Sequence, residues 1–392
     1  MSTPDATNQV SQVHEGQTME RWQPLTLFKA RESDDAELCR YWSQLKWSSS
    51  VDILKERRPP FFSHYRLQTD DYDSYLLRDE KEIVGMGSFL FREGLVGGMP
   101  ETIGFATDLS ISHDRRAITT WAQHFLPVLR GSTEPRGCRY VFTVFGPGQL
   151  NSFNSLIRPR TPKRAMPRFY LVRKFKAVSI HGFMPFVKPV KAIHVRNADI
   201  NDLEVLSDYL KRKSSAHLMA FNYNADLLNE RFRRWPNFSI SDFLMAFDGK
   251  KNLIGCVAPW QNTSTVKYHI DKVTGFSLTL QSTFFWTSLL GITNRFPKTN
   301  SEIPFSHLTH FYYENPDVMM SLAYHAFRAQ SNSLALIYPS FQNSLRNLPP
   351  SGCIRTELPF SLYVMMPPEA DLPGFLGGGE LTADPDIELA LI

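Results

Sequence analysis

The chain has 392 residues, of which 42% are hydrophobic and 21% are charged, with 43 basic against 39 acidic side chains. This length exceeds one ordinary core, so two domains of common size are expected. The net charge of +4 is too small to indicate a nucleic-acid-binding protein, and we expect no nucleic acid partner. The cysteines lie far apart without a CxxC pair, which argues against a disulfide framework and a zinc site; they are Cys39, Cys138, Cys256 and Cys353.

The two ends of the chain have the composition of tails. Residues 1–22 are rich in Ser, Thr, Gln and Asn and lack a basic start before an apolar run, so no signal peptide is expected. Residues 367–392, with PP, GGG and acidic residues, predict a tail or strap. The most apolar stretch, residues 276–292, is short for a membrane span and predicts a buried helix or strand pair. We therefore expect a cytoplasmic protein with no membrane partner.

The elements predicted along the first half alternate between strands and helices. Residues 50–56 indicate a helical piece that ends before Pro59 and Pro60. A hairpin follows, with a polar turn between two apolar strands. In chain order the predicted elements are a strand at 25–29, helices at 34–45 and 50–56, strands at 75–77, 83–91 and 102–111, a helix at 116–129, a strand at 139–145, a helix near 151–157 and a strand from 169.

Two sequence echoes indicate an internal repeat. Arg31-x-x-Asp34 and Arg196-x-x-Asp199 each stand between a strand-like run and a helical pattern, and both continue x-x-x-L. Gly85 and later Gly255 lie near the start of the second strands of two similar predicted hairpins, which begin at Ile83 and Leu253. The echoes come in the same order at nearly the same spacing. We therefore favour a duplication over two unrelated α/β domains.

The first half resembles the GNAT superfamily of acyl-coenzyme A-dependent N-acyltransferases. The resemblance is carried by the element order β-α-α-β-β-β-α-β-α-β and by Asp108-Leu-Ser-Ile-Ser-His-Asp-Arg115-Arg116-Ala-Ile-Thr-Thr, which is similar to the family's fourth strand, phosphate loop and next helix. It implies an α/β (mixed α+β) fold of two GNAT-like domains in tandem, each with a mixed, mainly antiparallel, splayed sheet flanked by helices. We expect them at residues 23–178 and, in degenerate form, 190–366.

The resemblance also implies acetyl-coenzyme A as the co-substrate. The backbone of a splayed strand would pair with the pantetheine arm as an added strand does, and the next helix would direct N–H groups and its positive dipole end at the pyrophosphate. The arm-pairing residues would be Leu109, Ser110 and Ile111. The phosphate and other cofactor contacts would be Arg115, Arg116, Ala117, Ile118, Thr119 and Asn151. The family's loop carries glycines where this chain has Ile118 and two threonines, whose side chains would crowd the phosphates.

Transfer to an amine requires a proton acceptor, for which the family often uses a carboxylate on the fourth strand. Asp108 is the only acidic residue on that predicted strand and is the expected base, with capping of the strand end as the alternative. His113, beside the loop, could contact the ligand or be incidental. No tyrosine stands where the family places its general acid, so that role is unassigned. The basic stretch 158–176 could border the coenzyme A 3′-phosphate or serve as a solvated connector.

The second half lacks a comparable phosphate cradle. An aromatic-rich insertion at 259–304 precedes a predicted strand at 305–313, and Asp317 at the next helix start would repel a phosphate. His307 and His310, three apart on that strand, do not make a credible zinc pair. We expect this half to shape a cleft or support the first.

The sequence therefore predicts an N-acyltransferase, most simply an N-acetyltransferase whose amine substrate attacks the thioester directly. Two alternatives stay open: a non-catalytic acyl-coenzyme A-binding or scaffolding protein, which the missing glycines and acid favour, and a tandem-domain transferase of aminoacyl or long-chain acyl groups. A small molecule or a peptide could supply the amine.

Overall fold

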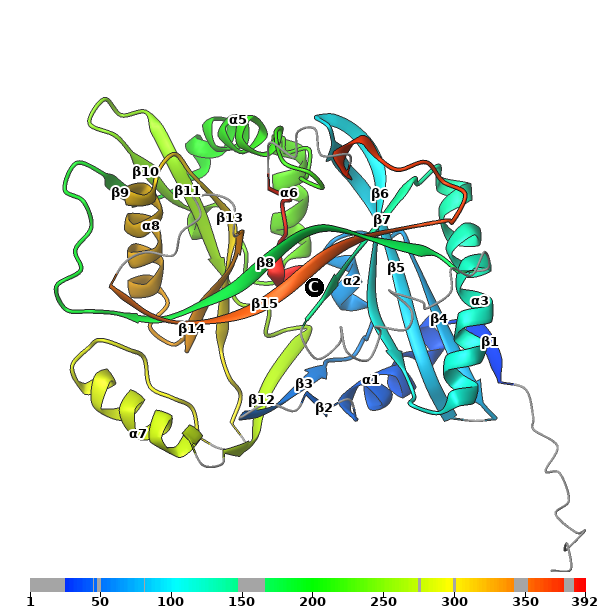
Figure 1. Cartoon of the computed structure of the whole chain (residues 1–392). Helices are drawn as coiled ribbons and strands as arrows, with labels where there is room; N and C mark the ends of the chain where they lie inside the picture. The colour runs from blue at the N-terminus through cyan, green and yellow to red at the C-terminus, as the bar shows by residue number, and fades with distance from the viewer. Residues whose placement is uncertain are drawn as a thin grey trace, which may run out of the picture.

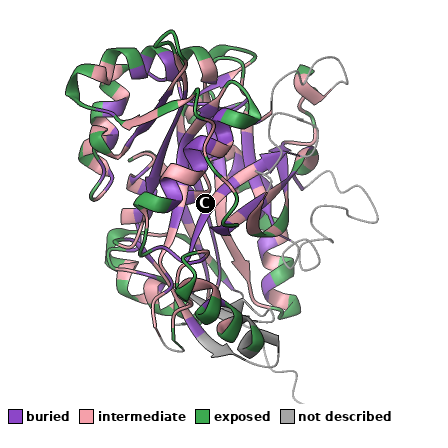
Figure 2. Ribbon diagram, turned by 90° about the vertical axis from the view of Figure 1, so that its left-hand side faces the viewer, coloured by how far each residue is buried: buried purple, intermediate pink, exposed green. Residues whose placement is uncertain are grey.

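The computed structural model describes residues 25–44, 46–47, 51–80, 82–146, 166–273, 276–298, 301–341, 352–376 and 384–392. Its main feature is one sheet of 12 strands that runs through both halves of the molecule, with helices packed on its faces (Figure 1). Buried residues follow the sheet, and exposed residues follow the outer sides of the helices (Figure 2). The strand order is β1-β4-β5-β6-β7-β15-β8-β14-β13-β11-β10-β9. The mixed, mainly antiparallel α/β fold expected from the sequence is confirmed.

Apart from residues 46–66, the described part of the first half follows the predicted order of strands and helices, and residues 147–165 lie outside the described residues. Its long helix places Trp121, Phe125 and Leu129 at helical spacing, and all three are buried against the sheet. The elements are β1 (Thr26–Lys29), α1 (Asp35–Ser43), α2 (Ser63–Arg66), β4 (Tyr72–Asp79), β5 (Glu82–Val96), β6 (Met99–Ile111), α3 (Arg115–Thr133), β7 (Tyr140–Phe145) and β8 (Arg168–Phe183).

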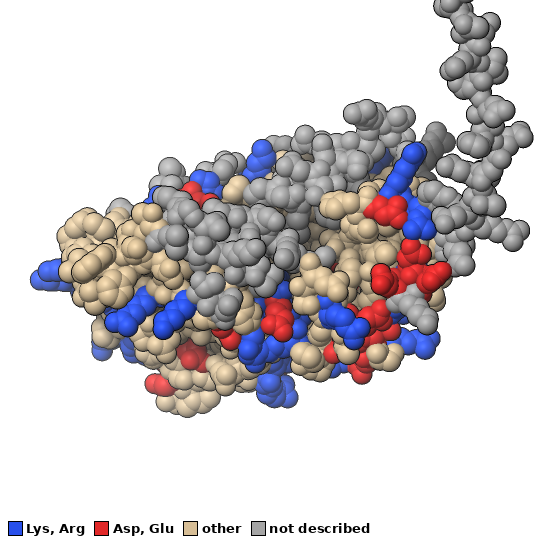
Figure 3. All heavy atoms as spheres, turned by 90° about the horizontal axis from the view of Figure 1, so that it is seen from below, with Lys and Arg blue, Asp and Glu red and all other residues tan. Residues whose placement is uncertain are grey.

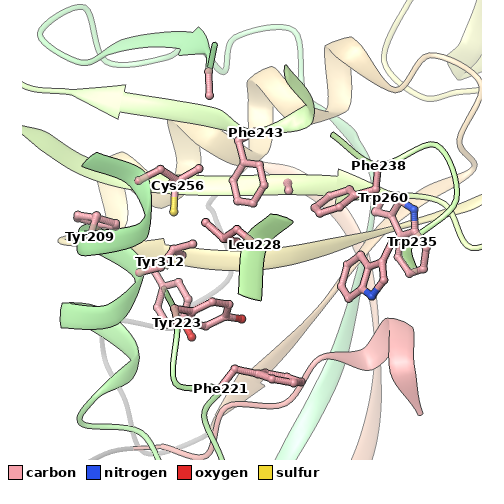
Figure 4. Packing of buried hydrophobic residues seen from close by; sticks show 14 of the residues in the cluster. Tyr209, Phe221, Tyr223, Leu228, Trp235, Phe238, Phe243, Cys256, Trp260 and Tyr312 are labelled. Carbon is pink, nitrogen blue, oxygen red and sulfur yellow. The ribbon is translucent and has the colours of Figure 1, made fainter. Parts of the chain in front are cut away.

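The second half repeats this order with an insertion before its fourth strand. Its core is aromatic, and the rings of Trp235 and Trp260 stack with centroids 4.3 Å apart (Figure 4). The elements are β9 (His194–Asn197), α5 (Leu203–Ser214), α6 (Ala225–Arg234), β10 (Leu244–Phe247), β11 (Leu253–Trp260), β12 (Val266–Val273), α7 (Phe276–Leu289), β13 (Phe305–Tyr313), α8 (Pro316–Ala329), β14 (Ala335–Phe341) and β15 (Cys353–Met366).

The two predicted hairpins are equivalent in detail. A Cβ atom added to Gly85 would lie 3.4 Å from the Ser110 carbonyl oxygen, and one added to Gly255 would lie 3.2 Å from that of Tyr312. At Gly255 side chains of α8 come closer still, with Val318 Cγ1 at 2.5 Å, so the second half requires glycine at this position more strictly than the first. The other sequence echo, Arg31-x-x-Asp34 and Arg196-x-x-Asp199, aligns differently in the structure. A 3₁₀ turn precedes the first helix of each half, and it begins directly after Arg31 in the first half and directly after Asp199 in the second. The structure thus aligns Arg31 with Asp199 and not with Arg196.

The halves exchange their last strands. β15, near the end of the chain, pairs with β7 of the first half, whereas β8 pairs with β14 of the second half. β8 and β15 then pair with each other antiparallel over most of their length. Because this exchange makes the sheet continuous, the domain limits at 23–178 and 190–366 remain a prediction.

Two local predictions were wrong. Residues 51–56 do not form a helix: they lie in β3 (Val51–Arg57), which pairs with β2 (Lys46–Trp47) and with β12 of the second half in a three-stranded sheet, and Ser50 lies outside the described residues. This partner is more than 200 residues away, so local periodicity does not reveal it. The apolar stretch 276–292 does form a helix, α7, but the helix is not buried, since Trp286 is 66% exposed.

Residues 384–392 lie between the halves. The Asp386 amide donates to the Leu218 carbonyl at 2.8 Å, and Glu388 forms a buried ion pair with Arg231 at 2.9 Å. Leu391 is buried in the aromatic core of the second half. This part of the predicted tail or strap therefore belongs to the core, whereas residues 1–22 and 377–383 lie outside the described residues. Within the described ranges, no helix is long and apolar enough to cross a membrane.

Candidate active site

The neighbouring parallel strands β6 and β7 separate before either ends. Their ladder runs from the pair Ile103/Tyr140 to the pair Ala106/Thr143. Beyond it β7 continues in its ladder with β15, and β6 continues in its ladder with β5. The β7-facing edge of residues 107–111 therefore has no paired strand among the described residues. Such an edge can accept an extended ligand through backbone hydrogen bonds.

A β-bulge interrupts β6 at this point. Two residues, Asp108 and Leu109, stand opposite Gly87 of β5, and Asp108 has a φ of 55°. A bulge of this kind turns side chains to the other face of a strand. Leu109 and Ile111 consequently pack toward α3, whereas the Ser110 hydroxyl accepts a hydrogen bond from Tyr41 at 3.2 Å. The three predicted arm-pairing residues thus lie on the separated part of β6.

The bulge directs Asp108 into a buried ion pair. Its two carboxylate oxygens lie 3.0 and 2.9 Å from Nη2 of Arg57, and the Tyr65 hydroxyl donates to one of them at 2.7 Å. The Thr107 hydroxyl is a third donor and makes the fourth contact, at 3.4 Å. The side chains of Arg57 and Asp108 are 0% and 3% exposed. Since a carboxylate has about four acceptor positions, little capacity remains to take a proton from an amine.

Further buried polar groups extend this cluster toward the second half. The Tyr65 hydroxyl also contacts the Ser88 hydroxyl at 2.8 Å, and burial raises the pKa of Tyr65 well above its ordinary value. Nδ1 of His64 lies 3.1 Å from the Thr265 hydroxyl. Burial, reinforced by the charge of Arg57, lowers the pKa of His64 well below its ordinary value.

A cavity of about 20 Å³ lies beside His64 at the junction of the halves, which is room for one water-sized group. His307 of β13 lines it as well, and burial together with Lys55 lowers the pKa of His307 to about 4. Nε2 of His64 and Nδ1 of His307 have no hydrogen-bond partner among the described residues. Burial and then Arg57 also lower the pKa of Lys55 to about 8. The junction therefore holds several groups that can exchange protons with a ligand.

The N-terminus of α3 directly follows the separated strand, as the sequence predicted. Asp114 caps it by accepting from the Arg116 amide at 3.0 Å, and the Arg116 side chain forms ion pairs with Asp114 at 3.0 Å and Asp79 at 2.8 Å. Arg115 is exposed and has no partner among the described residues. Ala117 is buried under the helix, whereas Ile118 and Thr119 are exposed on it. Among the predicted phosphate contacts that the structure describes, Arg115 is therefore the cation that no ion pair within the described chain engages.

The carboxylate cap leads to a prediction. Asp114→Asn should tighten coenzyme A binding roughly two- to fivefold, because asparagine caps a helix as well as aspartate and removes a negative charge from the end that favours anions. Titration calorimetry at low salt would measure the change. Asp317→Asn, at the equivalent helix start of the second half, is the matched control and should leave affinity unchanged. Equal or weaker affinity of Asp114→Asn would contradict this placement of the phosphates.

The second half repeats the separation and the bulge. The parallel ladder of β13 and β14 ends at the pair His307/Ile337, and β13 bulges where His310 has a φ of 51°. His310 contacts Arg231 through Nε2, and burial lowers the pKa of His310 to about 3. The histidine thus stands in the place of Asp108, with a buried arginine beside it in each half.

Solved structures share this architecture. Saccharomyces cerevisiae N-myristoyltransferase with bound myristoyl-CoA is 8% identical, covers 89% of this chain and 84% of its own, and has a TM-score of 0.50. A GCN5-related glucosamine N-acetyltransferase region of a fungal multi-domain GH3 β-N-acetylglucosaminidase is 11% identical, covers 88% of this chain and 38% of that protein, and has a TM-score of 0.54. The chain has the GNAT fold in two copies. No family model and no curated protein matches its sequence.

Within the GNAT fold, the structure adds residues that the sequence did not reveal. Arg57, His64 and Tyr65 precede the hairpin, in a segment where the sequence showed no functional pattern. The sequence feature in that segment was Pro59-Pro60, which stands between the end of β3 and the start of α2. The break allows residues of both elements to reach Asp108 of β6. The predicted Asn151 and helix near 151–157, together with residues 158–165 of the basic stretch 158–176, lie outside the described residues. The roles of the predicted site residues remain predictions.

Proposed function

We propose that this protein is an acyl-coenzyme A-dependent N-acyltransferase that binds its co-substrate at the first half. The observation that carries the proposal is the separation of β6 from β7 immediately before the N-terminus of α3. An acyl-coenzyme A laid there would pair its pantetheine amides with residues 107–111 and bring its pyrophosphate toward Arg115. The thioester would then lie near the bulge at Asp108.

The proposed reaction is direct attack of a primary amine on the thioester carbonyl. The C–N bond forms, the C–S bond breaks, the amine loses a proton and coenzyme A leaves as a thiol. Acetyl-coenzyme A is the simplest co-substrate. The structural neighbour with bound myristoyl-CoA makes a longer acyl chain the variant to compare with it.

Binding is tested first, by thermal unfolding with coenzyme A, acetyl-coenzyme A and myristoyl-coenzyme A. A ligand at 100 times its dissociation constant should add about 2.7 kcal/mol to the free energy of unfolding. Stabilisation by one acyl form then selects the donor for a thiol-release assay with primary amines. If none of the three stabilises the protein, the proposed cofactor site is wrong.

The role of Arg115 is a second, specific prediction. Arg115→Glu should weaken coenzyme A binding by roughly tenfold, because it replaces a charge-assisted hydrogen bond by repulsion. Titration calorimetry measures this, and dephospho-coenzyme A and pantetheine locate the effect along the ligand. Arg233→Glu, an exposed arginine of α6, is the control. If Arg115→Glu binds coenzyme A as tightly as the unchanged protein, the phosphate does not bind at this end of α3.

Acyl-coenzyme A binding without transfer is the second candidate. The specific observation is that donors within the chain already surround both oxygens of Asp108. This candidate predicts stabilisation by acyl-coenzyme A but no release of free thiol with any amine.

A further inference from the structure

Helix α7 has an apolar surface that the rest of the described chain leaves uncovered. Phe284 packs into a small cluster with Ile270 and Ile303 and attaches the helix to the second half. The residues beside it face outward: Trp286 is 66% exposed and Leu290 is 73% exposed. Residues 276–289 contain no charged side chain. Figure 1 shows α7 at the lower left, at the margin of the molecule.

A second exposed segment lies against the first. The Phe183 amide donates to the Ile292 carbonyl at 3.1 Å, and Gly182 forms a bridge with Thr293. These contacts hold the loop after β8 beside the end of α7. Phe186 of that loop is 73% exposed. We define the apolar face of α7 as Phe285, Trp286, Leu289, Leu290, Met184 and Phe186.

The charges within the two segments that carry this face have one sign. Residues 184–193 and 276–298 contain no aspartate or glutamate. Their charged side chains are Lys188, Lys191, Arg295 and Lys298, and all four are exposed. Figure 3, seen from below, shows this left-hand end as a largely uncharged surface bordered by Lys and Arg.

We propose that the apolar face of α7 docks on the surface of an anionic lipid bilayer. Exposed tryptophan, phenylalanine and leucine side chains partition into the boundary between headgroups and acyl chains. Basic residues near a membrane surface each strengthen attraction to anionic lipids. A bilayer offers apolar chains and continuous negative charge together, so one partner satisfies both features of the face. This proposal is independent of the proposed acyltransfer, and it replaces the expectation of no membrane partner.

Vesicle co-sedimentation tests the proposal with two lipid compositions. The full-length protein should bind phosphatidylcholine–phosphatidylserine vesicles and bind pure phosphatidylcholine vesicles at least tenfold more weakly, and added salt should weaken the first interaction. The double variant Trp286→Ser/Leu290→Ser should lose at least tenfold in affinity. Arg295→Glu/Lys298→Glu should lose a similar factor, but only toward the anionic vesicles.

A matched control uses exposed apolar side chains elsewhere. Ile200 and Leu358 are 69% and 58% exposed, and Ile200→Ser/Leu358→Ser should bind vesicles as the unchanged protein does. Thermal unfolding verifies that each variant is folded. Failure to bind either vesicle, or full binding by Trp286→Ser/Leu290→Ser, overturns the proposal. A dimer in gel filtration that the same double variant abolishes, without vesicle binding, would assign the face to a second copy of the chain instead.

Discussion

Replacing Arg57 by methionine should lower the free energy of unfolding by about 3–5 kcal/mol. The substitution keeps an unbranched apolar stem but removes the guanidinium group, so the Asp108 carboxylate stays buried without its counter-ion, which is the costly way to break a buried pair. The Asp108 side chain is 3% exposed, so water does not replace the lost partner. Urea denaturation at pH 7 followed by circular dichroism would measure the change.

A double variant separates structure from catalysis at Asp108. Asn at this position removes the charge and tolerates the positive φ of the bulge. Arg57→Met/Asp108→Asn should therefore recover part of the stability lost in Arg57→Met. If Asp108 is the proton acceptor, the double variant binds acyl-coenzyme A but releases no thiol with amines. If the carboxylate has only a structural role, thiol release returns with stability.

The control for this prediction is an exposed pair. Arg139 lies 2.6 Å from Glu101, with an Arg139 side chain that is 65% exposed. Arg139→Met should cost at most about 1 kcal/mol, because solvent screens such pairs. An Arg57→Met variant as stable as Arg139→Met would show that the buried pair does not hold the bulge in place.

Local sequence signals predicted the elements that depend on neighbours in the chain. The helical spacing of Trp121, Phe125 and Leu129 located α3, and the paired glycines Gly85 and Gly255 located the two hairpins. These features arise from helix periodicity and from close backbone approach, which a short window of sequence contains. The start of α3 was predicted for the same reason, whereas the separation of the strand before it was expected from the resemblance to the GNAT superfamily.

The parts that were missed depend on contacts between distant segments. β3 is a strand because β12, in the second half, supplies its hydrogen-bond partners, and β8 and β15 are exchanged between halves. Arg57 became part of the site through this β3 strand. A single sequence does not contain the pairing of distant strands, so neither the arginine nor the ion pair with Asp108 was foreseeable.

The bulge shows how the two halves diverged within one backbone geometry. Thr107-Asp108 and Thr309-His310 occupy equivalent positions, and the second residue of each pair has a positive φ. Asparagine, aspartate and histidine are enriched in that conformation. The two halves therefore share this backbone geometry but carry an acid in one and an imidazole in the other, and each side chain lies beside a buried arginine, Arg57 or Arg231.

Acidification from pH 7 to pH 5 should lower the free energy of unfolding, with a contribution of about 2 kcal/mol from His310 and a contribution of the same sign from His64. Burial lowers the pKa of both rings, that of His310 to about 3. Below the unfolded pKa of about 6.5 the unfolded chain therefore binds protons that the folded chain excludes. Stability from each group is present above that pH and is lost as the pH falls toward the folded pKa.

Asp386 acts in the opposite direction, since burial raises its pKa, so a comparison of variants is required. His310→Asn removes one titrating ring and tolerates the positive φ at this position. Between pH 7 and pH 5 its free energy of unfolding should fall by about 2 kcal/mol less than that of the unchanged protein. The control is His113→Asn, which alters an exposed histidine. Its free energy of unfolding should fall as steeply between pH 7 and pH 5 as that of the unchanged protein. Urea midpoints at pH 7, 6 and 5 decide the matter. The contrary result is a plot of unfolding free energy against pH for His310→Asn that runs parallel to the plot for the unchanged protein. It would mean that His310 is protonated in the folded state at pH 5 and that the packing of Arg231 around the bulge opens at that pH.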